Sequence, residues 1–333
     1  MYASNLRKAF LSLLAIGLIL SFASVSLAKP ITLKIGWTTA EGPTDPYAVT
    51  ARQFKKAINE VAPKQFDVQF FPNRALGDEK EMLEGLSFGT IDMAVITNAP
   101  VASIVSAFQI NDLPFLYSTD TQAFELMDGP VGNELKEQLK AKNIVALGFA
   151  ASGFRQMINN VRPVYSPDDV KGIKWRVMKN PVFIGMFRSL GGNAVPMAWG
   201  EVFTAVQQGT IDGLEIPLAV ILNNGYFEVC KYLSLTKHTY TGLWLLISKK
   251  KYDKLSDSQR TLLIEAAELA IKRERDLNAK HLKIMLDALN KKGMKVNKIK
   301  DPNAFRSKVG TVYDTFKPSI GPKLLDKALK QVQ

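Results

Sequence analysis

Residues 79–97 read EKEMLEGLSFGTIDMAVIT, and residues 199–217 read WGEVFTAVQQGTIDGLEIP. Each stretch predicts an amphipathic helix (79–88 and 201–207), then the tetrapeptide Gly-Thr-Ile-Asp, then an apolar strand. A strand that closes on proline, at Pro72 and at Pro196, precedes each helix. A four-residue match alone could arise by chance, but the matching context favours two similar α/β units in one chain.

Strands continue to alternate with helices outside these two stretches. Strands are predicted over residues 31–37, 68–71, 144–149, 154–159, 174–178 and 243–248, and helices over 47–61, 131–142 and 181–190. Asp78 is placed to cap the helix that follows it, with Glu81 three residues on in a capping-box arrangement. This alternation is typical of an α/β protein with a mainly parallel sheet and helices on both faces.

A long helical pattern fills residues 256–292. At about 1.5 Å per residue an unbroken helix of this length would reach ~50 Å, which exceeds one small domain, so it could bridge two. The same run could instead be two helices broken near Arg275, and the spacing of apolar residues does not decide between them.

The first 28 residues have the pattern of a secretory signal peptide. Arg7 and Lys8 form a basic head, an apolar stretch follows, and small residues end it at Ser26-Leu27-Ala28. The apolar stretch is short for a membrane anchor, at roughly 17 residues with several Ser and Gly among them. We therefore expect cleavage after Ala28 and a soluble mature protein in the periplasm.

Composition agrees with a secreted two-domain protein. The chain has 333 residues, 47% of them hydrophobic, and one cysteine, Cys230. A single cysteine forms no internal disulfide, so the fold must be held by its core. The formal charge of +12 falls to +10 when Arg7 and Lys8 are removed. An excess of basic residues is typical of proteins that bind nucleic acids or small anions. Secretion and the wide distribution of the lysines along the chain argue against nucleic-acid binding.

Motifs for catalysis or for metal binding are missing from the sequence. The two histidines, His238 and His281, are far apart, and no HExxH or CxxC pattern exists. No GxSxG, P-loop or GxGxxG motif is found either. A pair of carboxylates acting as acid and base is not excluded, but no motif places one. We therefore expect no enzymatic activity, no cofactor and no metal.

One arginine stands out within an apolar strand. Trp175 and Val177 flank Arg176 and point to the opposite face of the strand. Arginine offers a rigid fork that binds a carboxylate through two parallel hydrogen bonds. Arg176 is therefore either a surface residue on an edge strand or a functional guanidinium that faces a cleft, and the pattern leaves both open.

The run from Lys171 to Pro217 resembles the solute-binding proteins of TRAP transporters, the DctP family. The residues that carry the resemblance are KGIKWR at 171–176, Met186-Phe187 with Leu190-Gly191, Val195-Pro196-Met197, EVFTAVQQG at 201–209, and Asp212-Gly213 with Glu215 and Pro217. The resemblance extends over nearly the whole mature chain, and includes LGDE at 76–79 and GTID at 89–92.

The resemblance implies a two-lobed periplasmic binding protein fold, with hinge strands and one long helix across both lobes. Residues 29–152 plus about 242–281 would form lobe 1, and residues 153–241 plus about 282–333 would form lobe 2. The lobes would close on a small organic acid, and the protein would deliver it, as a monomer, to the subunits of a TRAP-type membrane permease. A sensor as the partner, a neutral sugar as the ligand and a periplasmic enzyme remain as alternatives.

The resemblance also assigns roles to residues of the cleft. It makes Arg176 the group that grips the ligand carboxylate, Arg155 a second cationic contact, and Trp199 part of an aromatic wall. The other residues expected at the cleft are Glu79, Thr97, Trp37, Thr39, Glu215 and His238. Each of these residues also has a purely structural alternative. The tryptophans could pack in the core, and Glu79 could be a carboxylate favoured by the dipole at a helix start. His238 could lie in the core or at the hinge.

Two positions depart from the family pattern. Ile216 stands where the family often has asparagine, and Lys179 stands where asparagine or a small residue is frequent. Both changes suggest a ligand with an apolar portion or a different placement of its acid group. The sequence does not name the acid, because dicarboxylates, sugar acids, keto acids and amino-acid derivatives all carry a carboxylate that Arg176 could bind.

Overall fold

A computed structural model describes residues 29–332 of the chain. The residues from Thr32 onward form one compact unit. The predicted signal peptide lies outside the described residues. None of the helices within residues 29–332 combines the length and the apolarity needed to cross a lipid bilayer.

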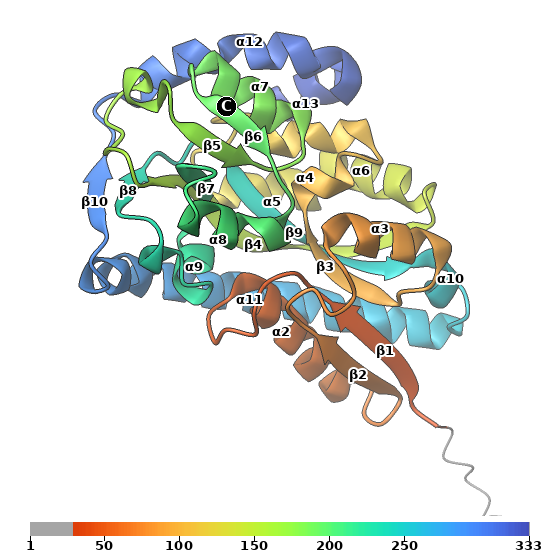
Figure 1. The fold of residues 1–333 in the computed structure, drawn as a ribbon. Coiled ribbons are helices and arrows are strands. Elements are labelled where there is room, and N and C mark those ends of the chain that lie inside the picture. The colour runs from red at the N-terminus through yellow and green to blue at the C-terminus, as the bar shows by residue number, and fades with distance from the viewer. Residues whose placement is uncertain (1–28, 333) are drawn as a thin grey trace, which may run out of the picture. The chain divides into compact units, whose positions relative to one another are not determined.

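A mixed β-sheet organises the chain, with its strands in the order β2-β1-β3-β9-β4-β7-β5-β6 (Figure 1). The bounds are β1 Ile31–Gly36, β2 Phe66–Phe71, β3 Met93–Thr97, β4 Ile144–Asn159, β5 Lys174–Val177, β6 Asn193–Pro196, β7 Gly213–Pro217 and β9 Tyr240–Ser248. Two further strands, β8 (Tyr232–Leu235) and β10 (Lys295–Lys298), attach to β4 through β8. The central strands β4 and β9 run antiparallel to each other and to their neighbours.

The two ends of the sheet are built alike, which confirms the predicted internal repeat. In the first repeat unit (β1, α2, β2, α3, β3) the strand order is β2-β1-β3, and in the second (β5, α7, β6, α8, β7) it is β6-β5-β7. The helices are α2 (Pro46–Val61) with α3 (Glu79–Phe88), and α7 (Pro181–Ser189) with α8 (Trp199–Gln207). Each unit is therefore a strand–helix–strand–helix–strand module with its first strand in the middle.

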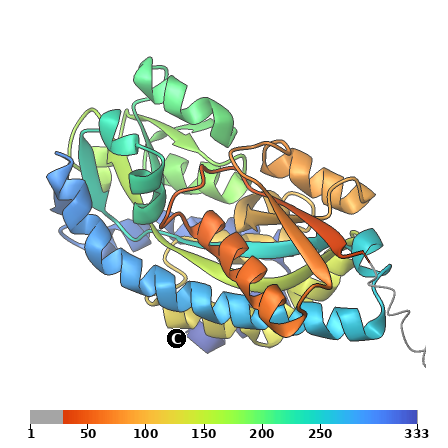
Figure 2. The same ribbon diagram turned by 90° about the horizontal axis from the view of Figure 1, so that it is seen from below.

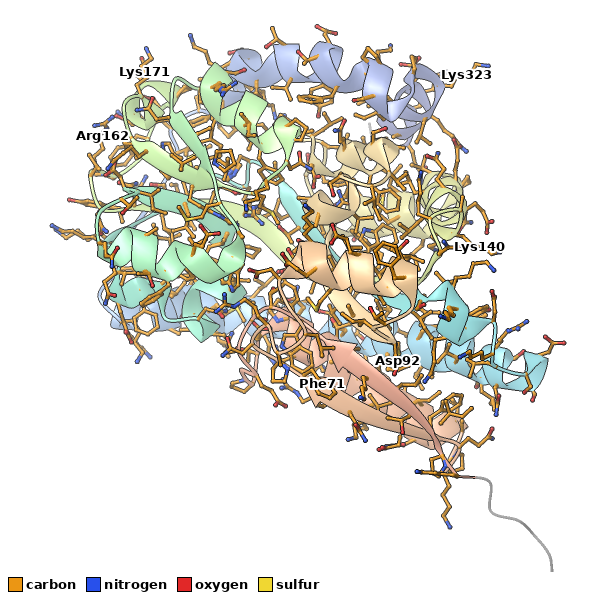
Figure 3. All side chains as sticks on the ribbon, turned by 45° about the vertical axis from the view of Figure 1, so that its right-hand side comes forward. Phe71, Asp92, Lys140, Arg162, Lys171 and Lys323 are labelled. Carbon is orange, nitrogen blue, oxygen red and sulfur yellow. The ribbon has the colours of Figure 1, made fainter. Side chains whose placement is uncertain are left out.

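The repeated Gly-Thr-Ile-Asp turns explain why the sequence repeats at these places. The glycine of each turn has a positive φ, 76° in the first and 70° in the second, which glycine adopts without steric cost. The carboxylate of Asp92 accepts a hydrogen bond from the backbone N–H of Lys34 at 3.1 Å, and that of Asp212 accepts one from Lys174 at 2.8 Å. Each turn thereby ties the last strand of its unit to the first (Asp92 is labelled in Figure 3).

Strand β4 joins the two ends of the sheet. It pairs with β9 along most of its length and then with β7 and β8. We predicted two strands here, at 144–149 and 154–159, but the structure has one strand with register shifts at Ala146/Gly148 and Ala151/Gly153. Bulges of this kind let a strand bend without ending, so a pattern that loses its alternation does not require a break.

Helix α11 (Asp257–Lys291) runs unbroken for 35 residues along the sheet (Figure 2). The predicted alternative of a break near Arg275 is wrong. The helix packs against α2 in the first repeat unit, against β4, and against α9 (Leu218–Asn223), which follows the second unit. A single long helix therefore spans both lobes of the fold, as expected.

The remaining helices cover the sheet. They are α4 (Asn98–Val101), α5 (Asp120–Asp128), α6 (Pro130–Lys140), α10 (Lys249–Tyr252), α12 (Pro302–Ile320) and α13 (Pro322–Val332), with 3₁₀ turns at Ser106–Asp112, Pro167–Val170 and Tyr226–Glu228. Of these helices we predicted only α6, and we predicted neither α9 nor the strands β8 and β10. Helix α12 packs on α7 and on the turn at 106–112, and α13 packs on α5 and α6.

The capping box predicted at Asp78 is wrong. Asp78 does occupy the N-cap position of α3, but its side chain makes no capping hydrogen bond. Its carboxylate is turned instead toward Arg74, with Nη1 and Oδ2 4.0 Å apart. The helix still begins here because Glu79 and Glu81 place acidic charge in its first turn, where the helix dipole favours it.

The cysteine belongs to the core, as the sequence suggested. Cys230 is 2% exposed and packs in an apolar cluster with Leu233, Ile221 and Met294. Burial raises the pKa of its thiol to about 12, so the thiolate does not form at neutral pH.

Candidate functional site

A small cavity lies where the two repeat units meet β4 and β9, at the carboxyl ends of β1, β3, β5 and β7. Ligands of open α/β sheets bind in such places. The volume of this inner cavity is about 30 Å³. Its lining consists of Thr38, Thr39, Tyr47, Glu79, Thr97, Ser152, Arg155, Arg176, Met178, Trp199, Ile216, Pro217, Val220 and Thr241.

A second and larger cavity adjoins the first. The outer cavity has a volume of about 330 Å³ and shares with the inner one the residues Glu79, Arg176, Met178 and Trp199. The rest of its lining consists of Asp78, Lys80, Glu81, Ala99, Pro100, Ser103, Lys179, Met197 and Ala198. The shared side chains form the wall between two connected parts of one site.

Arg176 is a buried cation at the centre of this wall. Its strand, β5, lies between β6 and β7, so the predicted alternative of an exposed edge-strand residue is wrong. Its Nε and Nη2 both donate to the carbonyl oxygen of Met197, at 3.0 and 2.7 Å, and its guanidinium carbon lies 6.0 Å from the centre of the Trp199 ring. Burial lowers the pKa of the Arg176 guanidinium. Within residues 29–332 no carboxylate forms a salt bridge with it.

Arg155 is also buried, but its charge is already balanced. Its Nε and Nη2 bind the carboxylate of Glu215, with Nη2 2.8 Å from Oε1, and Nη1 donates to Thr241 at 2.8 Å. On the far side His238 Nε2 lies 3.2 Å from Glu215, and Nδ1 lies 2.7 Å from Oγ1 of Thr236. Arg155, Glu215 and His238 thus form one buried network with the arginine nearest the cavity.

The pKa shifts of this network follow from its geometry. Burial alone would raise the pKa of Glu215, but the charge of Arg155 and the hydrogen bonds from His238 and Arg155 outweigh it and lower the pKa. Burial also lowers the pKa of His238, and the nearby carboxylate only partly offsets this. Glu215 is therefore charged and His238 neutral at neutral pH.

Glu79 is a buried carboxylate that lines both cavities. It is the first residue of α3 and is 8% exposed. The backbone N–H of Thr97 donates to it at 2.8 Å, the Thr97 hydroxyl at 2.9 Å and the Tyr47 hydroxyl at 3.3 Å. Burial raises the pKa of Glu79, and these hydrogen bonds counter only part of the rise.

Most of the residues predicted for the site come together at the cavities. Those that line the inner cavity are Arg176, Arg155, Trp199, Glu79, Thr97, Thr39 and Ile216. Lys179 is exposed and lines the outer cavity only. Trp37 is fully buried against Phe70, with ring centres 5.5 Å apart, and it lines neither cavity. Glu215 and His238 lie behind Arg155, outside both linings.

Ser152 is a site residue that the sequence analysis missed. It lies in the bulged part of β4, lines the inner cavity, and has a buried hydroxyl without a hydrogen-bond partner among the described residues. A buried hydroxyl without a partner is costly, so a ligand atom that bonds to it would be stabilised. No local pattern marks such a serine, because its role depends on strands far away in sequence.

The groups at the inner cavity suit an anion that also accepts and donates hydrogen bonds. Arg176 supplies a positive charge that forms no salt bridge within residues 29–332, although Glu79 and Glu215 lie near enough to interact with it, while Ser152 and Glu79 offer a hydroxyl and a carboxylate oxygen. Trp199 and Ile216 add apolar surface. Binding sites for small molecules commonly combine an apolar wall with a few polar groups that set orientation.

Comparison with known proteins agrees with this geometry. The family model described as bacterial extracellular solute-binding protein, family 7 (DctP), matches residues 38–319. The chain therefore belongs to the DctP family of extracellular solute-binding proteins. This family membership confirms the resemblance found in the sequence, and the family serves transport.

Relatives with named ligands are similar along their whole length. The 2,3-diketo-L-gulonate-binding periplasmic protein YiaO of Escherichia coli (strain K12) is 33% identical over 332 residues, which cover 99% of this chain and 100% of that protein. The sugar acid binding protein DctPAm of Advenella mimigardefordensis, solved with galactonate, has a TM-score of 0.88 at 31% identity and covers 91% of this chain and 98% of its own. A TRAP periplasmic solute-binding protein of Polaromonas sp JS666, solved with D-erythronate, has a TM-score of 0.86 at 34% identity and covers 90% and 98%. These structures confirm the two-lobed α/β fold.

Proposed function

We propose that this protein captures a small organic acid between two closing lobes and hands it to a TRAP-type permease without changing it chemically. The observation that carries the proposal is Arg176, a cation that is 3% exposed, borders both cavities and lacks a carboxylate partner within residues 29–332. The three relatives named above are described with acids, which supports the same ligand class here.

The physical case rests on the cost of an unpaired buried charge. Such a charge costs several kcal/mol, and a ligand carboxylate would offset the cost. The Arg176 Nε and Nη2 atoms already bind the Met197 carbonyl, so the Nη1 side of the fork is the part left for a ligand oxygen. A neutral sugar offers no counter-charge, and the alternative of a neutral ligand is disfavoured for that reason.

Arg155 would act mainly on the orientation of the ligand. Its charge is balanced by Glu215, so a carboxylate gains less net attraction from it than from Arg176. The network that includes His238 holds the Arg155 side chain in one place. We assign no proton transfer and no covalent step to these residues.

Lobe closure is the motion that this site requires. Residues of both repeat units and of β4 line the inner cavity, so a ligand carboxylate held there would be enclosed from both lobes, and opening of the lobes would admit it. We place the boundary at the bulge of β4, with residues 29–152 and about 242–281 in lobe 1, and residues 153–241 with about 282–333 in lobe 2. Helices α12 and α13 touch elements of both lobes, because α12 packs on α7 and on the turn at 106–112, and α13 packs on α12, α5 and α6.

Export and partner follow from the same proposal. Residues 1–28 would direct the chain to the periplasm and be removed, and the mature protein would work as a monomer with the membrane subunits of a TRAP permease. The periplasmic relative from E. coli covers 99% of this chain, which supports the same location.

Thermal unfolding of the ligand-stripped mature protein tests the proposal. A ligand at 100 times its Kd adds about 2.7 kcal/mol of stability, so a panel of small acids should contain compounds that raise Tm, while neutral sugars should not. Arg176→Gln should abolish the rise. Arg188→Gln, at an exposed arginine on α7, is the matched control and should keep it. A rise with a neutral sugar and with no acid would overturn the proposal.

A further inference from the structure

The inner and outer cavities differ in size by about tenfold. The inner cavity of about 30 Å³ has room for two or three water-sized atoms, because one water needs ~10–15 Å³ on this measure. Arg176 and Ser152 both border this space, so it fits the carboxylate of a ligand and little more. The rest of a ligand held there must pass the shared wall into the outer cavity of about 330 Å³.

The outer cavity is lined mainly by carbon. Three separate elements supply its apolar walls. Ala99 and Pro100 come from α4, Met178 follows β5, and Met197, Ala198 and Trp199 lead into α8. Methionine side chains adapt to ligands of different shape, and two of them stand here with a tryptophan. These apolar walls would pack against an apolar group of the ligand, while the polar and charged side chains take up the rest of the lining.

The charged residues of the outer cavity balance one another. Asp78 and Glu81 are acidic, and Lys80 and Lys179 are basic, so they offer no net charge to a second acid group. Glu79 faces both cavities as a carboxylate and would repel a second carboxylate on the ligand. A dicarboxylate is therefore disfavoured at this site.

We propose that the outer cavity is a subsite for the apolar tail of the bound acid, and that the ligand is a monocarboxylate with a branched-alkyl or phenyl-sized group. This inference rests on the proposed function and specifies its ligand. The volume is sufficient, since an apolar cavity of about 150 Å³ accommodates benzene.

A series of 2-hydroxy acids with one head group and growing tails tests the subsite. Lactate, 2-hydroxyisocaproate and 3-phenyllactate would be titrated into the ligand-stripped mature protein by calorimetry, with gluconate as the polyhydroxylated acid and 3-phenyl-1,2-propanediol as the neutral tail. Each buried methylene adds roughly fourfold in affinity, so 3-phenyllactate should bind at least about tenfold more tightly than lactate and than gluconate. The diol should not bind.

A substitution that fills the outer cavity provides the second arm. Ala198→Phe places a ring in the subsite at a half-buried position, and it should remove most of the advantage of 3-phenyllactate over lactate. Ala304→Phe, at a half-buried alanine of α12 outside both linings, is the matched control and should preserve that advantage. The series on the unmodified protein stands by itself if Ala198→Phe fails to fold.

The outcomes separate the two proposals. Acids that bind with no gain from the apolar tail, or gluconate that binds more tightly than 3-phenyllactate, would overturn the subsite and leave the proposed function in place. An unchanged advantage in Ala198→Phe would likewise overturn the subsite. Binding of the neutral diol with no binding of any acid would overturn both.

Discussion

The two repeat units share a scaffold but differ at the positions that meet the ligand cleft. The strand register pairs Ile35 with Met93 in the first unit and Trp175 with Gly213 in the second, one residue after the aspartate of each turn. Gly36 therefore corresponds to Arg176. The first unit has no side chain at the position where the second unit carries the buried guanidinium.

Packing explains why the first unit keeps glycine. A Cβ atom on Gly36 would lie 2.9 Å from the sulfur of Met82 and 3.0 Å from Cδ1 of Leu76, so α3 packs directly on the strand. The first helix residues also differ, with Glu79 opening α3 and Trp199 opening α8. One scaffold thus provides a close-packed, acidic side of the cleft and a cationic, aromatic side.

The largest effect should come from the carboxylate that balances Arg155. Glu215 occupies the place held by Val95 in the first unit and is fully buried. Glu215→Gln leaves Arg155 without its counter-charge, and we expect the free energy of unfolding to fall by about 3–5 kcal/mol. Urea denaturation at neutral pH measures this. Glu228→Gln, at an exposed glutamate, should change it by less than about 0.5 kcal/mol, and an equally small loss for Glu215→Gln would show that the pair is unimportant.

Substitution of Arg176 should weaken ligand binding strongly and change the stability of the protein little. Arg176→Gln removes a buried charge that has no carboxylate partner in the described chain, so the ligand-free protein should lose less than about 1 kcal/mol of stability. Affinity for the acid that stabilises the unmodified protein should drop about 100-fold, as expected for a truncated buried charge contact. Denaturation and calorimetry on one preparation give both numbers, and a large stability loss with little change in affinity would assign Arg176 to the scaffold.

The close packing at Gly36 can be tested by one added methyl group. Gly36→Ala should destabilise the protein by about 1–3 kcal/mol, because Met82 and Leu76 must shift. Gly310 is the matched control, since a Cβ there meets no atom within 4 Å and the residue lies in α12. Gly310→Ala should be neutral or slightly stabilising in the same denaturation assay, and equal effects of the two substitutions would contradict the packing argument.

The smallest effect should appear in the pH dependence of the two buried glutamates. The pKa of Glu79 is raised above the ordinary 4.5, so the folded state holds that proton more tightly and stability is lost as the pH rises through this range. The pKa of Glu215 is lowered, so its contribution is present above about pH 4.5 and is lost as the pH falls through the folded value.

Substitution by glutamine separates these contributions. The change in the free energy of unfolding caused by Glu79→Gln should be more favourable at pH 7 than at pH 4, and the change caused by Glu215→Gln should be less favourable at pH 7 than at pH 4. Denaturation midpoints at the two pH values measure both. The same direction of change in the two variants would contradict the assigned pKa shifts.

Local features of this fold could be predicted, and long-range ones could not. The repeat, the helical pattern of residues 256–292 and the strand around Arg176 follow from turn residues and apolar spacing within short windows, whereas the continuity of the long helix does not. The pairing of β10 with β8 and the continuity of β4 depend on partners far away in sequence.

The residues of the candidate site also differ in how well the sequence predicts their place. Residue type was sufficient to single out Arg176 as an arginine amid apolar strand residues, but it left a surface position on an edge strand open as the alternative. It was insufficient for His238 and Glu215, which lie one layer behind the cavity lining. It was also insufficient for Ser152, whose unpartnered hydroxyl becomes visible only when β4 takes its place in the sheet.

The buried thiol of Cys230 makes this chain convenient for fluorescence work. Because this thiol is 2% exposed and burial raises its pKa to about 12, we expect it not to react with maleimides at neutral pH in the folded protein. A cysteine introduced on the surface of either lobe would therefore be the sole labelling site, with the native residue left in place. Dyes attached in this way on the two sides of the cleft would convert ligand capture into an optical signal.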